Sequence, residues 1–218
     1  MTGARPLIVS DCDEVLLHMV SHFRDWLAER HDIEFRMDTA SFADALRHRG
    51  TGAAVAGDEI WRLLGLFFDH EMHRQHPVAG AVAAMNTLSR HADVVILTNL
   101  VDARREHRAQ QLAAHGIRAR VFTNQGPKGP ALAGIIAEYR PSFTIFIDDL
   151  AQHHRSVKEL LPEVTTLHLC AEALVAPHIP CAHRAGHADA RIDTWDEALP
   201  WLLERLGVAT PAPHKETT

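Results

Sequence analysis

The stretch Pro6-Leu7-Ile8-Val9-Ser10-Asp11-Cys12-Asp13 places two carboxylates two residues apart, directly after a short apolar run. Such a run predicts a buried strand. Side chains two residues apart lie on one side of a strand, and both can face one pocket where the strand ends. The pair suits a nucleophile with a separate general acid/base, or two ligands of a divalent cation. A polar loop with a helix-capping Asp has the same pattern, so the rest of the chain must decide.

Polar residues also follow later strand-like runs. Thr98-Asn99 follows residues 94–97, Lys128 comes shortly after residues 121–123, and Asp148-Asp149 follows residues 144–147. Each of these could instead be a strand end, a surface lysine or a helix cap. Their joint occurrence after successive strands favours one shared site.

The spacing of these runs predicts an α/β fold. Strands are expected at 7–9, 94–97, 121–123, 144–147 and 166–169, with helices at about 102–115, 129–140, 151–161 and 194–206. Short apolar runs rich in β-branched residues are typical of strands covered on both faces. Their alternation with helices indicates a doubly wound, Rossmann-like, mostly parallel sheet. Ligands bind at the carboxyl ends of such strands, where the polar residues fall.

In this order, the four signals resemble the motifs of the haloacid dehalogenase (HAD) superfamily, from Leu7 to about Leu150. The resemblance implies a small helical cap of the C1 type, inserted after the first strand. It divides the chain into an α/β core (1–15 and 80–208) and a helical cap (16–79). The polar, proline-containing tail (209–218) is predicted to be disordered from its composition. Within the cap, residues 16–30 and 59–73 have apolar side chains at helical spacing.

The resemblance also implies a role for each motif residue. Asp11 is the expected nucleophile, which forms an aspartyl-phosphate, and Asp13 the general acid/base. Thr98 and the backbone N–H of Asn99 are expected to bind phosphoryl oxygens. Lys128 is expected to hold Asp11 and the phosphoryl group together by relieving repulsion between the two anions.

The same resemblance implies a Mg²⁺ site formed by Asp11, the backbone carbonyl of Asp13, Asp148 and Asp149. Oxygen ligands suit Mg²⁺, which orients a phosphoryl group and screens its charge. By analogy, Asp149 is the expected direct ligand and Asp148 the water-mediated one.

Two positions depart from the family pattern. Glu14 stands where a Gly is usual, which predicts a different local turn. His153 stands four residues after Asp149, where relatives carry Asp or Asn, and a protonated imidazole there would weaken metal binding.

Composition narrows the class of protein. The chain has 218 residues, is 46% hydrophobic and carries a net charge of −6. This balance argues against a general nucleic-acid binder, and no apolar run approaches membrane-spanning length. A cytoplasmic protein is expected. Its three widely spaced cysteines, Cys12, Cys170 and Cys181, indicate thiols rather than a disulfide framework.

The expected activity is that of a Mg²⁺-dependent phosphomonoester hydrolase acting on a small phosphorylated metabolite. A phosphomutase, a dehalogenase of the same superfamily and a catalytically weak binding or regulatory protein remain open alternatives. Dehalogenases lack the second carboxylate that Asp13 supplies, which favours phosphate chemistry. The oligomeric state is not predictable from the sequence.

Two further residue sets have functional and structural interpretations. Arg24, Arg47, Arg49, Trp61 and Arg62 of the predicted cap could contact an anionic or sugar-like leaving group, or simply form a helix surface and packing. A second set could bind zinc, although solvated or core histidines are the favoured interpretation. It comprises His168, Cys170, His178, Cys181, His183 and His187.

Overall fold

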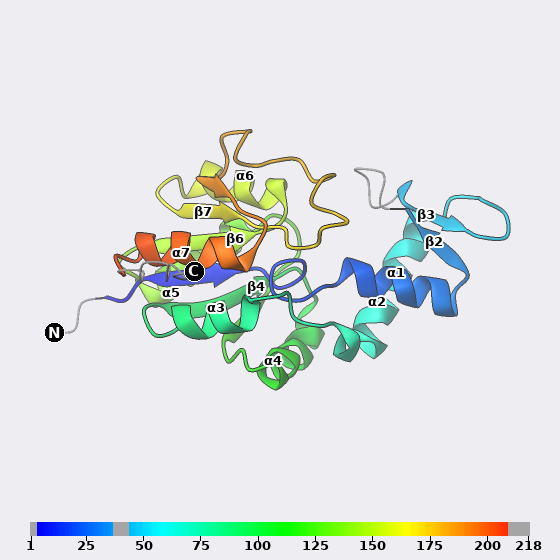
Figure 1. Ribbon diagram of the computed structural model, residues 1–218, viewed down its shortest axis with the longest axis horizontal. Helices are drawn as coiled ribbons and strands as arrows, with labels where there is room; N and C mark the ends of the chain where they lie inside the picture. Colours follow the sequence, from blue (N-terminus) through cyan, green and yellow to red (C-terminus); the bar gives the residue numbers. More distant parts are fainter. Residues whose placement is uncertain (1–3, 37–43, 209–218) are drawn as a thin grey trace, which may run out of the picture.

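The computed structural model describes residues 4–36 and 44–208. The larger part is a sheet covered by helices, and the smaller part contains two helices and a short hairpin (Figure 1). The predicted disordered tail, 209–218, lies outside the described residues.

The core is a six-stranded sheet in the order β5-β4-β1-β6-β7-β8, and every neighbouring pair is parallel. The strands are β1 (Leu7–Ser10), β4 (Asp93–Thr98), β5 (Arg120–Thr123), β6 (Thr144–Asp148), β7 (Thr165–His168) and β8 (Ala190–Arg191). The predicted α/β class with a doubly wound, mostly parallel sheet is therefore confirmed. Of these six strands, β8 alone has no predicted counterpart, because a run of two residues is too short to form a pattern.

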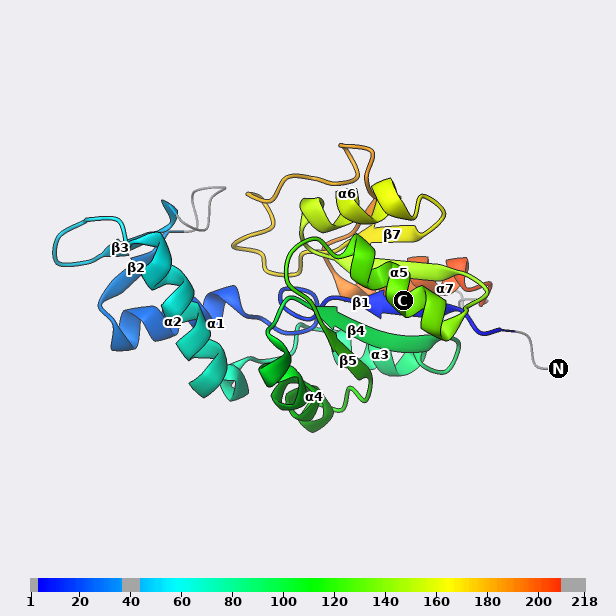
Figure 2. The same ribbon diagram turned by 180° about the vertical axis from the view of Figure 1, so that it is seen from behind.

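Helices cover both faces of the sheet (Figures 1 and 2). They are α3 (Ala81–Leu88), α4 (Arg105–Ala114), α5 (Gly129–Tyr139), α6 (Ala151–Leu160) and α7 (Trp195–Arg205), and the short helix η3 (Asp102–Arg104) precedes α4. Alternate β1 residues point to opposite faces. Ile8 packs in the cluster that contains α3, α4 and α7 residues, whereas Leu7 and Val9 pack with α5 and α6. Two-sided burial explains the uninterrupted apolar strands.

Residues 16–79, called the cap segment below, lie between β1 and α3. They contain α1 (Val20–Arg30), β2 (Ile33–Phe35), β3 (Leu46–His48), α2 (Gly57–His70) and η2 (Met72–Arg74). The cap segment has its own apolar cluster, centred on residues such as Phe23, Trp26 and Phe67. The antiparallel β2–β3 pair was not predicted: three-residue strands carry too little periodicity to be recognised.

The first cap helix begins later than predicted. Helical spacing placed its start at Leu16, but α1 begins at Val20. Leu16 and Leu17 instead pack in the core cluster beneath the sheet. The Glu14 carboxylate accepts hydrogen bonds from the backbone N–H groups of Met19 and Val20, and so satisfies two donors at the start of the helix.

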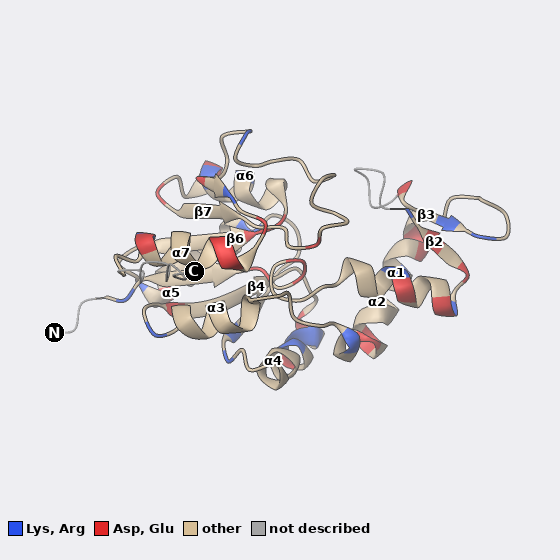
Figure 3. Ribbon diagram, in the orientation of Figure 1, with Lys and Arg blue, Asp and Glu red and all other residues tan. Residues whose placement is uncertain are grey.

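Lys and Arg are dispersed among Asp and Glu over both parts of the chain (Figure 3). None of the described helices is long and apolar enough to cross a membrane.

Candidate active site

The buried amine of Lys128 joins two of the predicted carboxylates. Its Nζ lies 2.8 Å from Oδ1 of Asp11 and 2.7 Å from Oδ2 of Asp148. Asp11 follows β1, Asp148 ends β6 and Lys128 immediately precedes α5. Because β1 and β6 are parallel neighbours, their carboxyl ends bring the two carboxylates to the same edge.

These groups strongly affect one another's ionisation. Burial raises the pKa of Asp11 to about 7, although the Lys128 charge opposes the shift. Burial also favours the neutral form of Asp148, but the charge and hydrogen bond of Lys128, together with the neighbouring His153 and His154, outweigh it and lower the pKa of that carboxyl. The two carboxylates together raise the pKa of Lys128 against its own burial. Lys128 is therefore a permanent cation beside the predicted nucleophile.

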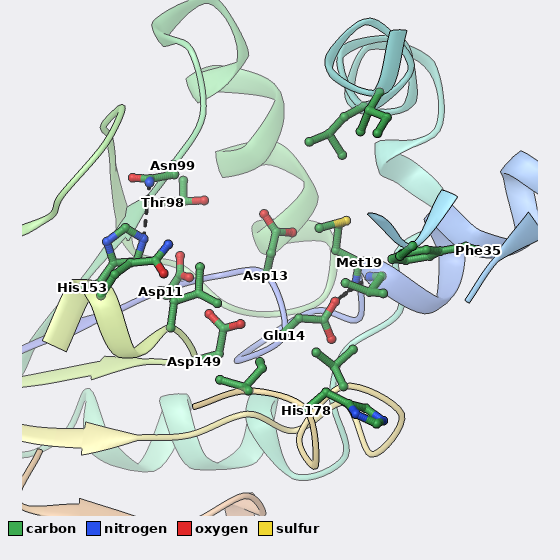
Figure 4. Close-up of a pocket in the computed structure, with 18 of the residues that line it drawn as sticks. Asp11, Asp13, Glu14, Met19, Phe35, Thr98, Asn99, Asp149, His153 and His178 are labelled. Carbon is green, nitrogen blue, oxygen red and sulfur yellow. Dashed lines mark hydrogen bonds between the residues drawn. The ribbon is translucent and has the colours of Figure 1, made fainter. Parts of the chain in front are cut away.

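Asp149 is the carboxylate without a partner. It is buried and faces the cavity beside Asp11 (Figure 4), but its carboxylate makes no hydrogen bond or ion pair with the described residues. Burial, followed by the charges of Asp148 and Asp11, raises its pKa well above the ordinary value. A buried carboxylate in such surroundings is costly unless a cation neutralises it.

The residues at this edge fit a hard divalent cation. Oxygen atoms of Asp11, Asp148 and Asp149 lie within 4.8 Å of one another. The backbone carbonyl of Asp13 accepts no hydrogen bond from the described residues and offers a further oxygen. An all-oxygen set with three carboxylates is the donor chemistry that Mg²⁺ prefers.

Thr98 and Asn99 lie at the end of β4, and Figure 4 shows Asp11 between them and Asp149. The Thr98 hydroxyl is buried and has no hydrogen-bond partner in the described residues. The Asn99 side chain donates to the carbonyl of Gly126 at 3.0 Å and so ties this strand end to the loop before Lys128. Thr98 therefore offers an unused hydroxyl to a ligand above Asp11.

Asp13 is held by two residues that the sequence analysis did not identify. Its Oδ1 accepts a hydrogen bond from Gln75 Nε2 at 2.8 Å and lies 3.0 Å from Arg108 Nη2. Arg108 comes from α4 and is fully buried, where it also contacts the Cys12 sulfur. Arg108 lies one helical turn before Leu112, on the apolar stripe of its helix. An Arg at such a position requires a buried partner, and this was the sequence signal that could have identified it.

Glu14, the first departure from the family pattern, adopts the left-handed backbone conformation at φ 62°. This conformation explains why Gly suits the position. Burial raises the pKa of Glu14 to about 8, against the hydrogen bonds from Val20 and Met19. Glu14 also lies near His18 and Glu172, and His18 contacts Glu172 at 3.1 Å. In this chain the residue therefore caps α1 at the edge of the cavity.

His153, the second departure, is buried beside Asn99, with Nε2 of the ring 3.4 Å from Nδ2 of that residue. Burial lowers the pKa of His153, so the ring is neutral near pH 7. The weakening of metal binding that a protonated imidazole would cause does not arise at that pH.

Two other buried histidines support the acidic pair. His154 Nε2 lies 2.9 Å from the Asp148 carbonyl, and His168 Nε2 lies 2.7 Å from the Asp149 carbonyl. The Ala182 N–H donates to His168 Nδ1, which assigns the proton of that ring to Nε2. Burial lowers the pKa of His168 to about 4. These neutral rings fix the backbone of the acidic pair.

The His168-to-His187 set considered for zinc is not brought together. Within residues 4–36 and 44–208, three or more candidate ligands converge in two groups, Asp11-Asp148-Asp149 and Glu14-His18-Glu172. Neither group includes a member of that set, and His168 is already engaged with backbone atoms.

A cavity of about 460 Å³ opens above Asp11, between the core and the cap segment (Figure 4). Of the five cap residues considered for a polar leaving group, Trp61 alone lines it; Arg24, Arg47, Arg49 and Arg62 do not. Helix-surface charge, the alternative interpretation, accounts for Arg24 and Arg62, which pair with Asp25 and Glu59 of their own helices.

No protein-family model matches the chain, and no curated protein matches it in sequence. Solved structures do match in shape. A HAD family hydrolase from Deinococcus radiodurans R1, with bound phosphate and sodium, is 17% identical at a TM-score of 0.63. The alignment covers 96% of this chain and 99% of that one.

Two further neighbours carry different activities in their names. A candidate beta-phosphoglucomutase from Thermotoga maritima is 12% identical at a TM-score of 0.62 over 91% of this chain and 99% of its own. A 2-haloacid dehalogenase from Pseudomonas syringae pv. Tomato DC3000 is 14% identical at 0.55, over 92% and 99%. The chain therefore has the fold of haloacid dehalogenase-like hydrolases, and the fold by itself does not select among their reactions.

Proposed function

We propose that this protein is a magnesium-dependent phosphomonoester hydrolase of the haloacid dehalogenase superfamily that acts on a small phosphorylated metabolite. The observation that carries the proposal is that Asp11 lies 2.8 Å from the Lys128 amine and within 4.8 Å of the unpaired Asp149 carboxylate. This arrangement supplies a nucleophile, a fixed cation and a place for a second cation. A dianionic phosphoryl group needs all three, because it must approach a carboxylate.

The reaction would proceed in two steps. A carboxylate oxygen of Asp11 attacks phosphorus, the bond from phosphorus to the ester oxygen breaks, and the departing alkoxide takes a proton from Asp13. Water then attacks the aspartyl-phosphate and gives a proton to Asp13 as the bond from phosphorus to Asp11 breaks. The products are the alcohol and inorganic phosphate.

Other side chains would position the phosphoryl group. The unpartnered Thr98 hydroxyl and the Asn99 backbone N–H would bind its oxygens. Lys128 would neutralise charge shared by the phosphoryl group and Asp11. Asp11, Asp148, Asp149 and the Asp13 carbonyl would hold Mg²⁺, which would supply positive charge to screen the phosphoryl oxygens. Arg108 and Gln75 would orient Asp13.

Dehalogenation would use Asp11 on carbon and requires no cation, so it leaves the unpaired Asp149 carboxylate without a role. A phosphomutase would use the same residues and differ in passing the phosphoryl group to a second alcohol. The two are separated by their products, since a hydrolase releases inorganic phosphate stoichiometrically with alcohol.

The test is phosphate release from a panel of phosphomonoesters in Mg²⁺ and in EDTA, with wild type, Asp11→Asn and an Asp25→Asn control on the exposed face of α1. Release that requires Mg²⁺, is lost in Asp11→Asn and persists in the control is expected. Release that survives Asp11→Asn would contradict the assigned nucleophile. Halide release from 2-chloropropionate in EDTA, without phosphatase activity, would favour the dehalogenase.

A further inference from the structure

The cavity above Asp11 is polar at its floor and mostly apolar on its walls. The floor consists of Asp11, Asp149 and Thr98 from the carboxyl ends of the strands. The cap segment supplies most of the walls: Met19, Val20, Phe35, Ile60, Leu64 and Phe68. Figure 4 shows Met19 and Phe35 across the cavity from Asp11 and Asp149. A ligand whose phosphoryl group sits at the floor would therefore place its leaving group against the walls.

Packing holds these walls in place. Val20, Phe35, Ile60 and Phe68 are buried members of the cap cluster, and Val175 from the loop after β7 packs against the same cluster. The core and the cap segment therefore close the cavity with apolar atoms from both sides. Because these side chains are well packed, they do not readily move away from the cavity, and the walls stay apolar when a ligand binds.

Polar side chains are sparse where a leaving group would lie. Beyond the floor, the acid/base Asp13 and the core residue His153, one buried polar side chain lines the described walls: Glu14, whose Oε2 has no hydrogen-bond partner in the described residues. The other groups able to bind a sugar hydroxyl are Arg36, Gln152, His178 and the Trp61 indole, all solvent-exposed. A sugar or nucleoside carries several hydroxyls, and against these mostly apolar walls it would lose more hydrogen bonds to water than Glu14 could replace. Unpaired buried hydroxyls lower affinity substantially.

The size of the cavity suits a small ring. A volume of about 460 Å³ lies within the usual range of small-molecule sites, which is roughly 300–1,000 Å³. After a phosphoryl group is accommodated at the floor, the remaining space takes a leaving group of one or two rings, or a branched alkyl chain.

We infer that the substrates of this site are phosphomonoesters of apolar alcohols or phenols, with an alicyclic, branched alkyl or aryl leaving group, rather than sugar phosphates or nucleotides. The inference rests on the proposed function and specifies its substrate class. Apolar contact between the leaving group and the cap walls, kept in the transition state, would raise kcat/KM.

A matched pair of esters tests the inference. Cyclohexylmethyl phosphate and glucose 6-phosphate both carry a primary phosphate ester on a six-membered ring, and they differ mainly in the ring oxygen and hydroxyls. Wild type is expected to hydrolyse cyclohexylmethyl phosphate with a kcat/KM at least about tenfold higher. Asp11-dependent release with glucose 6-phosphate equal or preferred would overturn the inference and leave the proposed function standing.

A matched pair of variants tests the wall itself. Leu64 lines the cavity, whereas Leu66, two residues along α2, does not, although both are partly buried against the cap cluster. Leu64→Gln should lower kcat/KM for cyclohexylmethyl phosphate about tenfold and reduce the preference. Leu66→Gln should leave the preference intact. Equal effects of the two substitutions would contradict a wall that contacts the leaving group.

Absence of Asp11-dependent release from both esters and from the whole phosphomonoester panel would contradict the proposed function without measuring the preference. Calorimetry on Asp11→Asn protein then decides the preference, since this variant is expected to bind the esters without turnover. Tighter binding of cyclohexylmethyl phosphate would support the apolar class. Equal or reversed affinities would overturn it.

Discussion

Nη2 of Arg108 lies 3.0 Å from Oδ1 of Asp13, and the guanidinium that makes this contact has no exposed surface. The same guanidinium lies 5.6 Å from the centre of the Phe68 ring, which belongs to α2 of the cap segment. Arg108 therefore contacts both the predicted general acid/base and a residue of the cavity wall. The orientation of Asp13 depends on a helix that carries no predicted motif.

Replacement of Arg108 by Met should lower kcat about 10- to 100-fold, because a misplaced acid/base transfers protons poorly. Arg105→Met, at an exposed position on the same helix, should leave kcat near wild type. Steady-state kinetics checks both, with thermal unfolding to show that each variant is folded. Wild-type kcat in folded Arg108→Met would show that Asp13 needs no such support.

Lys128→Met should destabilise the metal-free protein by about 3–5 kcal/mol, because the buried Asp11 and Asp148 would lose their shared cation. Lys158→Met is the control: Lys158 pairs with Asp189, whose side chain is 43% exposed. Water can replace that contact, so a loss of about 1 kcal/mol is expected. Urea unfolding in EDTA measures both values. Similar losses for the two lysines would show that the buried network contributes little.

Much of the site could be predicted because its residues end strands. Asp11, Thr98 and Asp148 each follow an apolar run, and parallel strands bring their carboxyl ends to one edge. Predicting that these residues share one edge of the sheet requires only the order of strands and loops along the chain. Lys128 was predictable from its place in the motif order, although its 2.8 Å contact with Asp11 was not.

The unpredicted features depend on contacts between distant segments. Gln75 contacts Asp13 from 62 residues away, in a linker, and Arg108 contacts it from 95 residues away, in a helix. Neither segment carries a motif. The β2–β3 hairpin lacks a repeating pattern, and Leu16 and Leu17 have helical spacing but are buried in the core. Local periodicity reports which side chains are apolar and does not report which cluster buries them.

Gly129→Ala should destabilise the protein by about 1–3 kcal/mol, because a Cβ there would lie 2.4 Å from the Ser156 carbonyl oxygen of α6. Relief of that clash would also move the adjacent Lys128, so activity should fall. Gly134→Ala lies on the same helix with no atom within 4 Å of the new Cβ. It should stabilise by about 0.5–1 kcal/mol through helix propensity. Thermal unfolding compares them, and equal effects would contradict the close α5–α6 packing.

Asp149→Asn should have opposite effects without and with metal. In EDTA, removal of a buried, unpaired carboxylate beside Asp11 and Asp148 should raise the free energy of unfolding by on the order of 1 kcal/mol. In Mg²⁺ at 100 times its Kd, wild type should gain about 2.7 kcal/mol, whereas the variant should gain much less. Thermal unfolding with and without Mg²⁺ gives both differences, with Asp25→Asn as the control. A full Mg²⁺ gain in Asp149→Asn would exclude this carboxylate as a direct ligand, and a loss of stability in EDTA would show that it has a stabilising partner.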